Sequence, residues 1–86
     1  MDVDFTRAFN KQFEKLIRKK QDQVRQAVAL FLQDTATPSL HNHGLTGEWQ
    51  GFRSIRVGGD LRLHFRVITD NRVLFVAVGS HSQLYK

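Results

Sequence analysis

Histidine and arginine side chains in the second half of the chain are the groups best suited to chemistry. Cleavage of RNA without a metal needs a base for the 2′-hydroxyl, an acid for the leaving 5′-oxygen and cations for the charged phosphorane. Histidine exchanges protons near neutral pH, arginine binds phosphate, and Asp60 is able to orient a histidine or act as a base. The residues that match this set, apart from Asp60, are His41, His43, His64, His81, Arg53, Arg56, Arg62 and Arg66. A packing or loop role is the alternative for each histidine.

The distribution of charge favours the same half. Residues 51–86 contain six Lys or Arg and two Asp or Glu, a net of +4, whereas residues 1–50 contain seven and six, a net of +1. Five of those six cations are arginines. The second half is therefore expected to face a polyanion such as nucleic acid, although a merely solvated basic sheet face would have the same composition.

Other classes of site have weaker support. No cysteine is present, so thiol chemistry and thiolate–zinc sites are excluded, and a reducing, cytoplasmic compartment is expected. The segment His41-Asn42-His43 matches no standard zinc spacing, and no glycine pair opens a helix as a phosphate loop would. No window is apolar enough to span a membrane, and acidic residues occupy the N-terminus where a secretory leader is basic. We therefore expect no metal, no cofactor and no membrane association.

The first 33 residues predict a short strand and two helices. Residues 3–5 have the pattern of an edge strand, and Thr6 is placed to cap a helix whose apolar positions are Phe9, Phe13, Leu16 and Ile17. The basic residues 18–20 suit the C-terminus of that helix. Asp22 is then expected to cap a second helix, forming a hairpin with the first, with a buried stripe made of Val24, Ala27, Val28, Phe31 and Leu32.

The remainder predicts a long loop and three strands. Residues 34–51 lack periodicity, contain the only proline, Pro38, and hold Trp49, so a functional loop is expected. Residues 52–57, 61–68 and 72–78 alternate or are continuously apolar and predict an antiparallel meander, the last strand being central. The prediction is one α+β domain, residues 1–86, with a short N-terminal strand, a helical hairpin and a three-stranded meander packed against the helices.

The turn at residues 58–60 decides which side chains share a face with Arg62 and His64. A two-residue turn at Gly58 and Gly59 would place Arg53 and Ile55 there. A three-residue turn through Asp60 would place Ser54 and Arg56 there and bury Ile55 and Val57. Burial of two β-branched side chains, worth roughly 1.5–3 kcal/mol each, favours the second register and so predicts Arg56 in the site.

The order of residues from the loop to the end of the chain resembles the YafQ branch of the RelE/ParE toxin superfamily. The motif carrying the resemblance is His43-Gly44-Leu45-x-Gly47-x-Trp49-x-Gly51-Phe52-Arg53, then Asp60, then Gly79-Ser80-His81-x-x-Leu84-Tyr85. Such toxins are ribosome-dependent endoribonucleases that cleave mRNA. Each is held silent by a cognate antitoxin, expected to be small, acidic and DNA-binding. The resemblance thus implies a RelE-like fold and a ribosome and mRNA as partners.

Residue by residue, the resemblance implies that His43, Asp60 and His81 are catalytic and that Tyr85 holds the substrate. Arg62 falls where toxins closer to RelE place an arginine that stabilises the transition state. Arg56 stands in place of one family histidine, and Ala77 in place of a family arginine. The basic side chains Arg53, His64 and Arg66 are predicted to bind the substrate, whereas His41 matches no family position, and its replacement by alanine is expected to do little.

The sequence is compatible with two other functions. ParE-type toxins share the fold but inhibit gyrase by binding, and fold does not separate the two activities. An inactive binding module is the second alternative, supported by the departures at Arg56 and Ala77.

Overall fold

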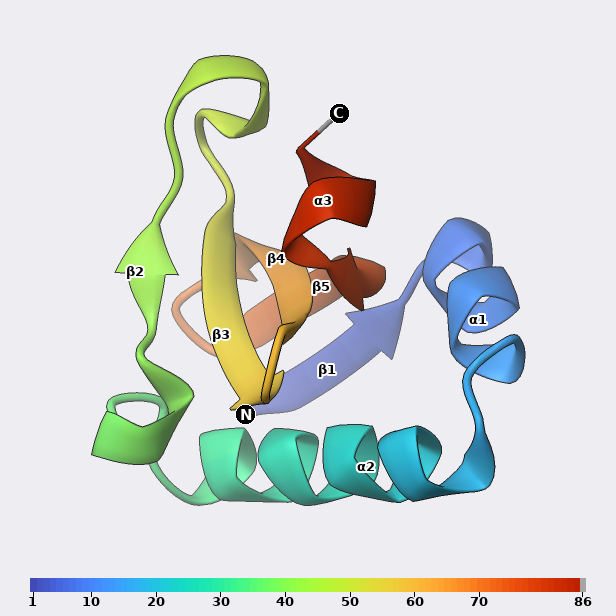
Figure 1. Cartoon of the computed structure of the whole chain (residues 1–86). Coiled ribbons are helices and arrows are strands. Elements are labelled where there is room, and N and C mark those ends of the chain that lie inside the picture. The colour runs from blue at the N-terminus through green and yellow to red at the C-terminus, as the bar shows by residue number, and fades with distance from the viewer. Residues whose placement is uncertain (86) are drawn as a thin grey trace.

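The computed structural model describes residues 1–85 and contains one mixed five-stranded sheet with helices on both of its faces (Figure 1). The strand order is β1-β5-β4-β3-β2, with β1 parallel to β5 and the other neighbours antiparallel. The elements are β1 (Asp2–Phe5), α1 (Arg7–Glu14), α2 (Arg18–Gln33), β2 (His43–Gly44), β3 (Arg53–Gly58), β4 (Leu61–Thr69), β5 (Arg72–Ser80) and α3 (His81–Leu84). The predicted α+β fold, with its short first strand, two helices and meander, is confirmed, and β2 and α3 are additions to it.

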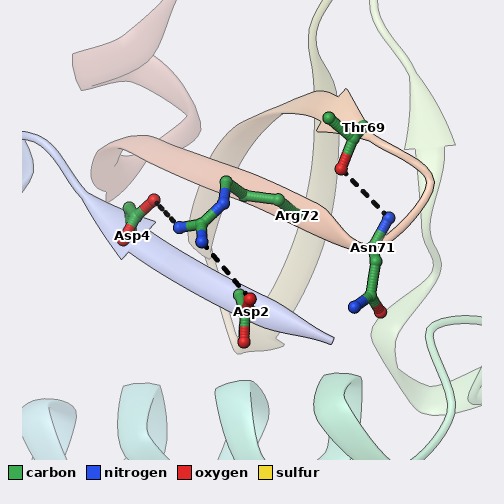
Figure 2. A network of polar contacts seen from close by, with 5 residues as sticks. All are labelled: Asp2, Asp4, Thr69, Asn71 and Arg72. Atoms are coloured by element: carbon green, nitrogen blue, oxygen red, sulfur yellow. Dashed lines mark hydrogen bonds and ion pairs between the residues drawn. The ribbon is translucent and has the colours of Figure 1, made fainter.

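The N-terminal strand is held beside β5 by charge as well as by backbone pairing. Arg72 donates to Asp4 over 2.6 Å and to Asp2 over 3.3 Å, as Figure 2 shows. The hydrogen bond to Asp4, followed by the charges of Asp4 and Asp2, raises the pKa of Arg72. The same figure shows Thr69 accepting from the backbone of Asn71 in the β4–β5 turn. These exposed ion pairs select the register of β1 more than they add stability.

The core lies between α2 and one face of the sheet. Phe31 of α2 meets Phe65 and Phe75 edge to face, with ring centroids 5.0 and 5.6 Å apart. Phe9 of α1 extends this aromatic group through its contact with Phe75. The predicted stripe of α2 is confirmed at Val24, Ala27 and Phe31, all buried. Leu32 was wrongly assigned to it, because one residue beyond Phe31 the helix turns its side chain outward.

The helix boundaries differ from those predicted. Thr6 does cap α1, accepting from the backbone of Phe9, but α1 ends at Glu14 and the basic residues 18–20 begin α2. Gln21 explains the break, because its side chain donates to the carbonyl of Phe13 and satisfies the end of α1 from the next helix. Asp22 lies inside α2, where it pairs with Arg25, and does not cap the helix.

The register between β3 and β4 confirms the prediction made from burial. Arg56 pairs with Arg62 and Ser54 with His64, and Ile55 is fully buried on the opposite face. The turn itself is tighter than expected, since Gly58 already pairs with Leu61 and a bulge at residue 57 restores the register.

We expect Phe31→Ala to destabilise the fold by about 3–5 kcal/mol, because it removes a ring packed on two strands and leaves a cavity. Urea unfolding measures the change. Leu32→Ala is the matched control, since the neighbouring side chain is 43% exposed and its loss should cost well under half as much. Similar losses for the two variants would contradict the assigned face of α2.

Candidate active site

Five of the residues proposed from sequence gather around one open hollow of about 250 Å³ on the sheet face opposite α2. They come from three different strands, from α3 and from the residue after it, so only the folded sheet brings them together. The lining residues are His41, His43, Ser54, Arg56, Arg62, His81 and Tyr85.

His43 is held by strand pairing of its backbone and by a hydrogen bond of its ring. It belongs to β2 and pairs with Ser54 of β3, so the loop is anchored to the sheet at this point. The ring nitrogen Nδ1 lies 2.8 Å from the carbonyl oxygen of His41. A carbonyl only accepts, so Nδ1 carries the proton of this bond and the Nε2 lone pair of the neutral ring is free. His43 is therefore arranged to take a proton through Nε2.

His81 begins the short helix α3, which continues directly from β5. Ser80 and Gln83 form a reciprocal capping box at its start, and this fixes the turn. The ring of His81 remains exposed and lies 4.5 Å, centroid to centroid, from that of Tyr85. The sequence signal for α3 was the Ser-x-x-Gln spacing, which was not recognised as a helix start.

The arginines Arg56 and Arg62 face each other directly across β3 and β4. Like charges in such a pair repel, and within residues 1–85 neither is within ion-pair distance of a carboxylate. Arg62 donates to the carbonyls of Gly59 and Leu61, each over 3.2 Å. Two unneutralised cations at the hollow make it suited to an anion such as a phosphodiester.

His64 is buried and is not among the residues that line the hollow, which corrects its assignment to substrate binding. Its side chain is fully buried beneath Trp49, whose ring lies 4.4 Å away, and Nε2 lies 3.3 Å from the hydroxyl of Tyr85. Burial, with smaller contributions from His43 and His81, lowers its pKa to about 4. His64 is therefore neutral at physiological pH.

The sheet face that carries Arg62 and His64 is thus partly covered by the long loop. Trp49 comes from the turn at Gly47–Trp49 and donates through Nε1 to the carbonyl of Leu84, which ties the long loop to α3. Figure 1 shows this loop and α3 on the side of the sheet away from α2. Among residues 1–85, the buried side-chain atoms without a hydrogen-bond partner are Ser54 Oγ and His64 Nδ1, from two residues that pair across β3 and β4.

Three other predicted site residues lie outside the hollow. Asp60 stands on the β3–β4 turn and lines a separate depression with lysines of α2. Arg53 is on the opposite face, opposite Phe65, and donates through Nε to Asn42. Arg66 is exposed further along β4. Alternation in β3 explains Arg53, because side chains one residue from Ser54 point to the other side of the sheet.

Two residues at the hollow were missed. His41 was set aside because no family position corresponds to it, yet its ring lies 5.2 Å from that of His43. Ser54 was placed on this face by register and given no role. No group of three or more His, Asp or Glu side chains in the described part of the chain is arranged to hold a metal ion. None of the helices in that part is long and apolar enough to cross a membrane.

Known proteins resemble the whole chain. The model of the YafQ toxin family, described as a bacterial toxin of type II toxin–antitoxin systems, matches residues 1–86. The crystal structure of YafQ from E. coli strain BL21(DE3) has a TM-score of 0.80 at 23% identity, covering 99% of this chain and 98% of that one.

Two further structures agree. HP0894 from Helicobacter pylori, solved in solution, has 30% identity and a TM-score of 0.68, with 99% of each chain covered. YafQ in the E. coli DinJ–YafQ complex has 24% identity and a TM-score of 0.73, covering 99% of this chain and 98% of that one. The E. coli structures bear on the fold alone. No protein of curated function matches the chain.

The buried, neutral His64 predicts a pH-dependent stability. The unfolded chain takes up a proton near pH 6.5 and the folded chain only near pH 4, so the unfolded state binds more protons between these values. Stability should therefore fall as the pH is lowered, by about 2 kcal/mol between pH 7.5 and 5.0. Urea unfolding at both pH values measures this.

His64→Gln, which is uncharged at both pH values, should lose most of this pH dependence. His81→Gln is the matched control, since it removes an exposed histidine and should retain it. Equal pH dependence in the parent and His64→Gln would show that His64 is not the group responsible.

Proposed function

Because the chain belongs to the YafQ family of toxins of bacterial type II toxin–antitoxin systems, we propose that it is an endoribonuclease that cleaves mRNA on the ribosome. The observation that carries this proposal is the convergence on one hollow of two histidines and two arginines that have no ion-pair partner within residues 1–85: His43, His81, Arg56 and Arg62. A gyrase inhibitor that acts by binding has no need of two such histidines and two arginines at one hollow.

The proton transfers follow from how the two histidines are held. His43 has its Nε2 lone pair free and takes the proton of the 2′-hydroxyl, whose oxygen then attacks the adjacent phosphorus. His81, exposed at the start of α3, protonates the leaving 5′-oxygen. The P–O5′ bond breaks as the P–O2′ bond forms, leaving a cyclic phosphate and a 5′-hydroxyl.

The arginines act on the phosphorane that forms between these steps. Arg56 and Arg62 face each other across two strands, so a phosphate at the hollow would receive charge-assisted hydrogen bonds from both sides and relieve their mutual repulsion. Tyr85 lines the hollow with its ring next to that of His81, where it is able to stack on a base or contact a sugar. Asp60 has no role in this scheme, because it lines a different depression.

Dependence on the ribosome fits the size of the hollow. At about 250 Å³ it is smaller than the roughly 300–1,000 Å³ of pockets that enclose a small ligand. In this proposal the protein supplies the acid, the base and the cations, and the ribosome holds the mRNA in place. The net charge of +5 favours association with the ribosome's polyanionic surface.

The regulatory partner in this proposal is a small, acidic, DNA-binding antitoxin encoded with the toxin. E. coli YafQ is found in a complex with the antitoxin DinJ. An acidic segment over the hollow would neutralise Arg56 and Arg62 and exclude the substrate.

We expect His81→Ala to reduce mRNA cleavage by about 10²–10⁴-fold, because general-acid assistance to the leaving oxygen is lost. Single-turnover cleavage of ribosome-bound message measures this, and the exposed position of His81 predicts unchanged unfolding. A parent rate retained in the variant would remove the acid assignment.

A cell-free translation extract distinguishes the three classes of function. The proposed nuclease stalls translation and leaves cleaved message, a gyrase inhibitor leaves translation running while blocking supercoiling, and an inert module does neither.

We also expect Arg62→Ala to slow cleavage about 10²-fold or more, since it removes a cation from the developing charge. Arg66→Ala is the matched control, because it removes the same side chain from the same strand outside the hollow. Its single-turnover rate on saturating ribosome complexes should stay within about threefold of the parent. Equal losses in both variants would indicate general attraction to RNA instead of a catalytic contact.

A further inference from the structure

His41 has a left-handed backbone conformation. Within residues 1–85 it is the one non-glycine residue with a positive φ, 49°, and its ψ of 50° places it in the left-handed helical region. L-residues rarely adopt this conformation, and it persists only where the surroundings hold it. Such residues concentrate at functional sites.

The segment on either side of His41 is fixed by packing and by hydrogen bonds. Pro38 begins a single helical turn, Leu40 is buried in the core, and the amide of His41 donates to the carbonyl of Pro38 over 3.1 Å.

The next residue is held from two sides. Asn42 donates to the carbonyl of Thr35 over 3.0 Å and accepts from Arg53 Nε over 2.9 Å. His41 therefore lies between buried Leu40 and hydrogen-bonded Asn42, which fix the backbone on both sides of it. Arg53 has a structural role here, because it donates to Asn42.

The consequence of the left-handed turn is the direction of one carbonyl. The oxygen of His41 lies 2.8 Å from Nδ1 of His43, two residues on, and it is the partner that fixes the proton on that nitrogen. The only hydrogen bond of the His43 ring within residues 1–85 is this one. The hydrogen bonds that the two ring nitrogens make decide which of them carries the proton. For His43, the bond from Nδ1 to the carbonyl of His41 therefore decides the tautomer.

We propose that His41 is a positioning residue that acts through its backbone: its left-handed conformation aims the carbonyl at His43 Nδ1 and keeps the Nε2 lone pair available for the substrate. The imidazole of His41 takes no part in this. The catalytic consequence rests on the proposed ribonuclease function, whereas the tautomer of His43 is a property of the free protein.

Two variants of His41 separate the backbone from the side chain. His41→Asn removes the imidazole but keeps a residue that readily adopts the left-handed conformation, whereas His41→Val introduces a β-branched residue that disfavours it. Nitrogen-15 NMR of the histidine rings at pH 8 reports the tautomer of each neutral ring, and His43→Gln assigns the His43 signals. Where His41→Val does not fold, His41→Ala is the milder disfavoured variant.

The expected result is the Nδ1–H tautomer of His43 in the parent and in His41→Asn, and its loss in His41→Val. Single-turnover cleavage should follow the tautomer, with His41→Asn near the parent and His41→Val slower by about 10- to 100-fold.

An Nε2–H tautomer of His43 in the parent overturns the proposal. A His43 tautomer that does not change between the parent and His41→Val also overturns it. A loss in His41→Asn equal to that in His41→Val assigns the effect to the imidazole and also overturns it. The NMR result holds whether or not the protein cleaves RNA, so it is independent of a failure of the proposed function.

Discussion

The register between β3 and β4 is the constraint on which the hollow depends. Because side chains alternate across a strand, a slip of one residue would send Ile55 into solvent and carry Arg56 to the core side. Burial of Ile55 therefore also fixes the position of a cation. The bulge at residue 57 allows this register together with a tight glycine turn, and it keeps two arginines opposed despite their repulsion. Core packing thus supports the electrostatic strain that makes the hollow receptive to an anion.

An uncharged aromatic group adjoins the hollow through Tyr85. His64, Trp49 and Tyr85 are joined by ring contacts and by the bond to the Tyr85 hydroxyl. Burial keeps His64 neutral, so the positive charge stays at the surface of the hollow. The same aromatic group positions the end of the chain, because Leu84 is hydrogen-bonded to Trp49 and Tyr85 to His64.

The two departures from the family pattern have a common structural explanation. Ala77 is buried opposite His64 in the β4–β5 pair, where the resemblance implies an arginine. A long charged side chain there would compete for the space that His64 occupies under Trp49. Arg62, on the neighbouring strand, and Arg56, in place of the family histidine, supply cations at the hollow instead. Relative to the pattern that the resemblance implies, one cation and one histidine are replaced by two arginines, and the hollow keeps His43 and His81 as the histidines of the proposed proton transfers.

Much of this protein was determined by local pattern. The fold was predicted from the alternation in β4, the apolar run in β5 and the cap at Thr6. The face of Arg56 and Arg62 was predicted from the burial of Ile55, since strand geometry acts over neighbouring residues. The polar loop and the terminal motif identified His43, His81 and Tyr85 as candidates.

Only the tertiary structure decided which candidates meet. The bond from Trp49 to Leu84 joins residues 35 apart, and it buries His64 under a roof that no local pattern indicates. The network around Asn42 likewise turns Arg53 into a support and His41 into a neighbour of His43. Such roles follow from long-range contacts, whose partners the sequence of each segment does not specify, and residue type sets only what a side chain is able to do once it is placed.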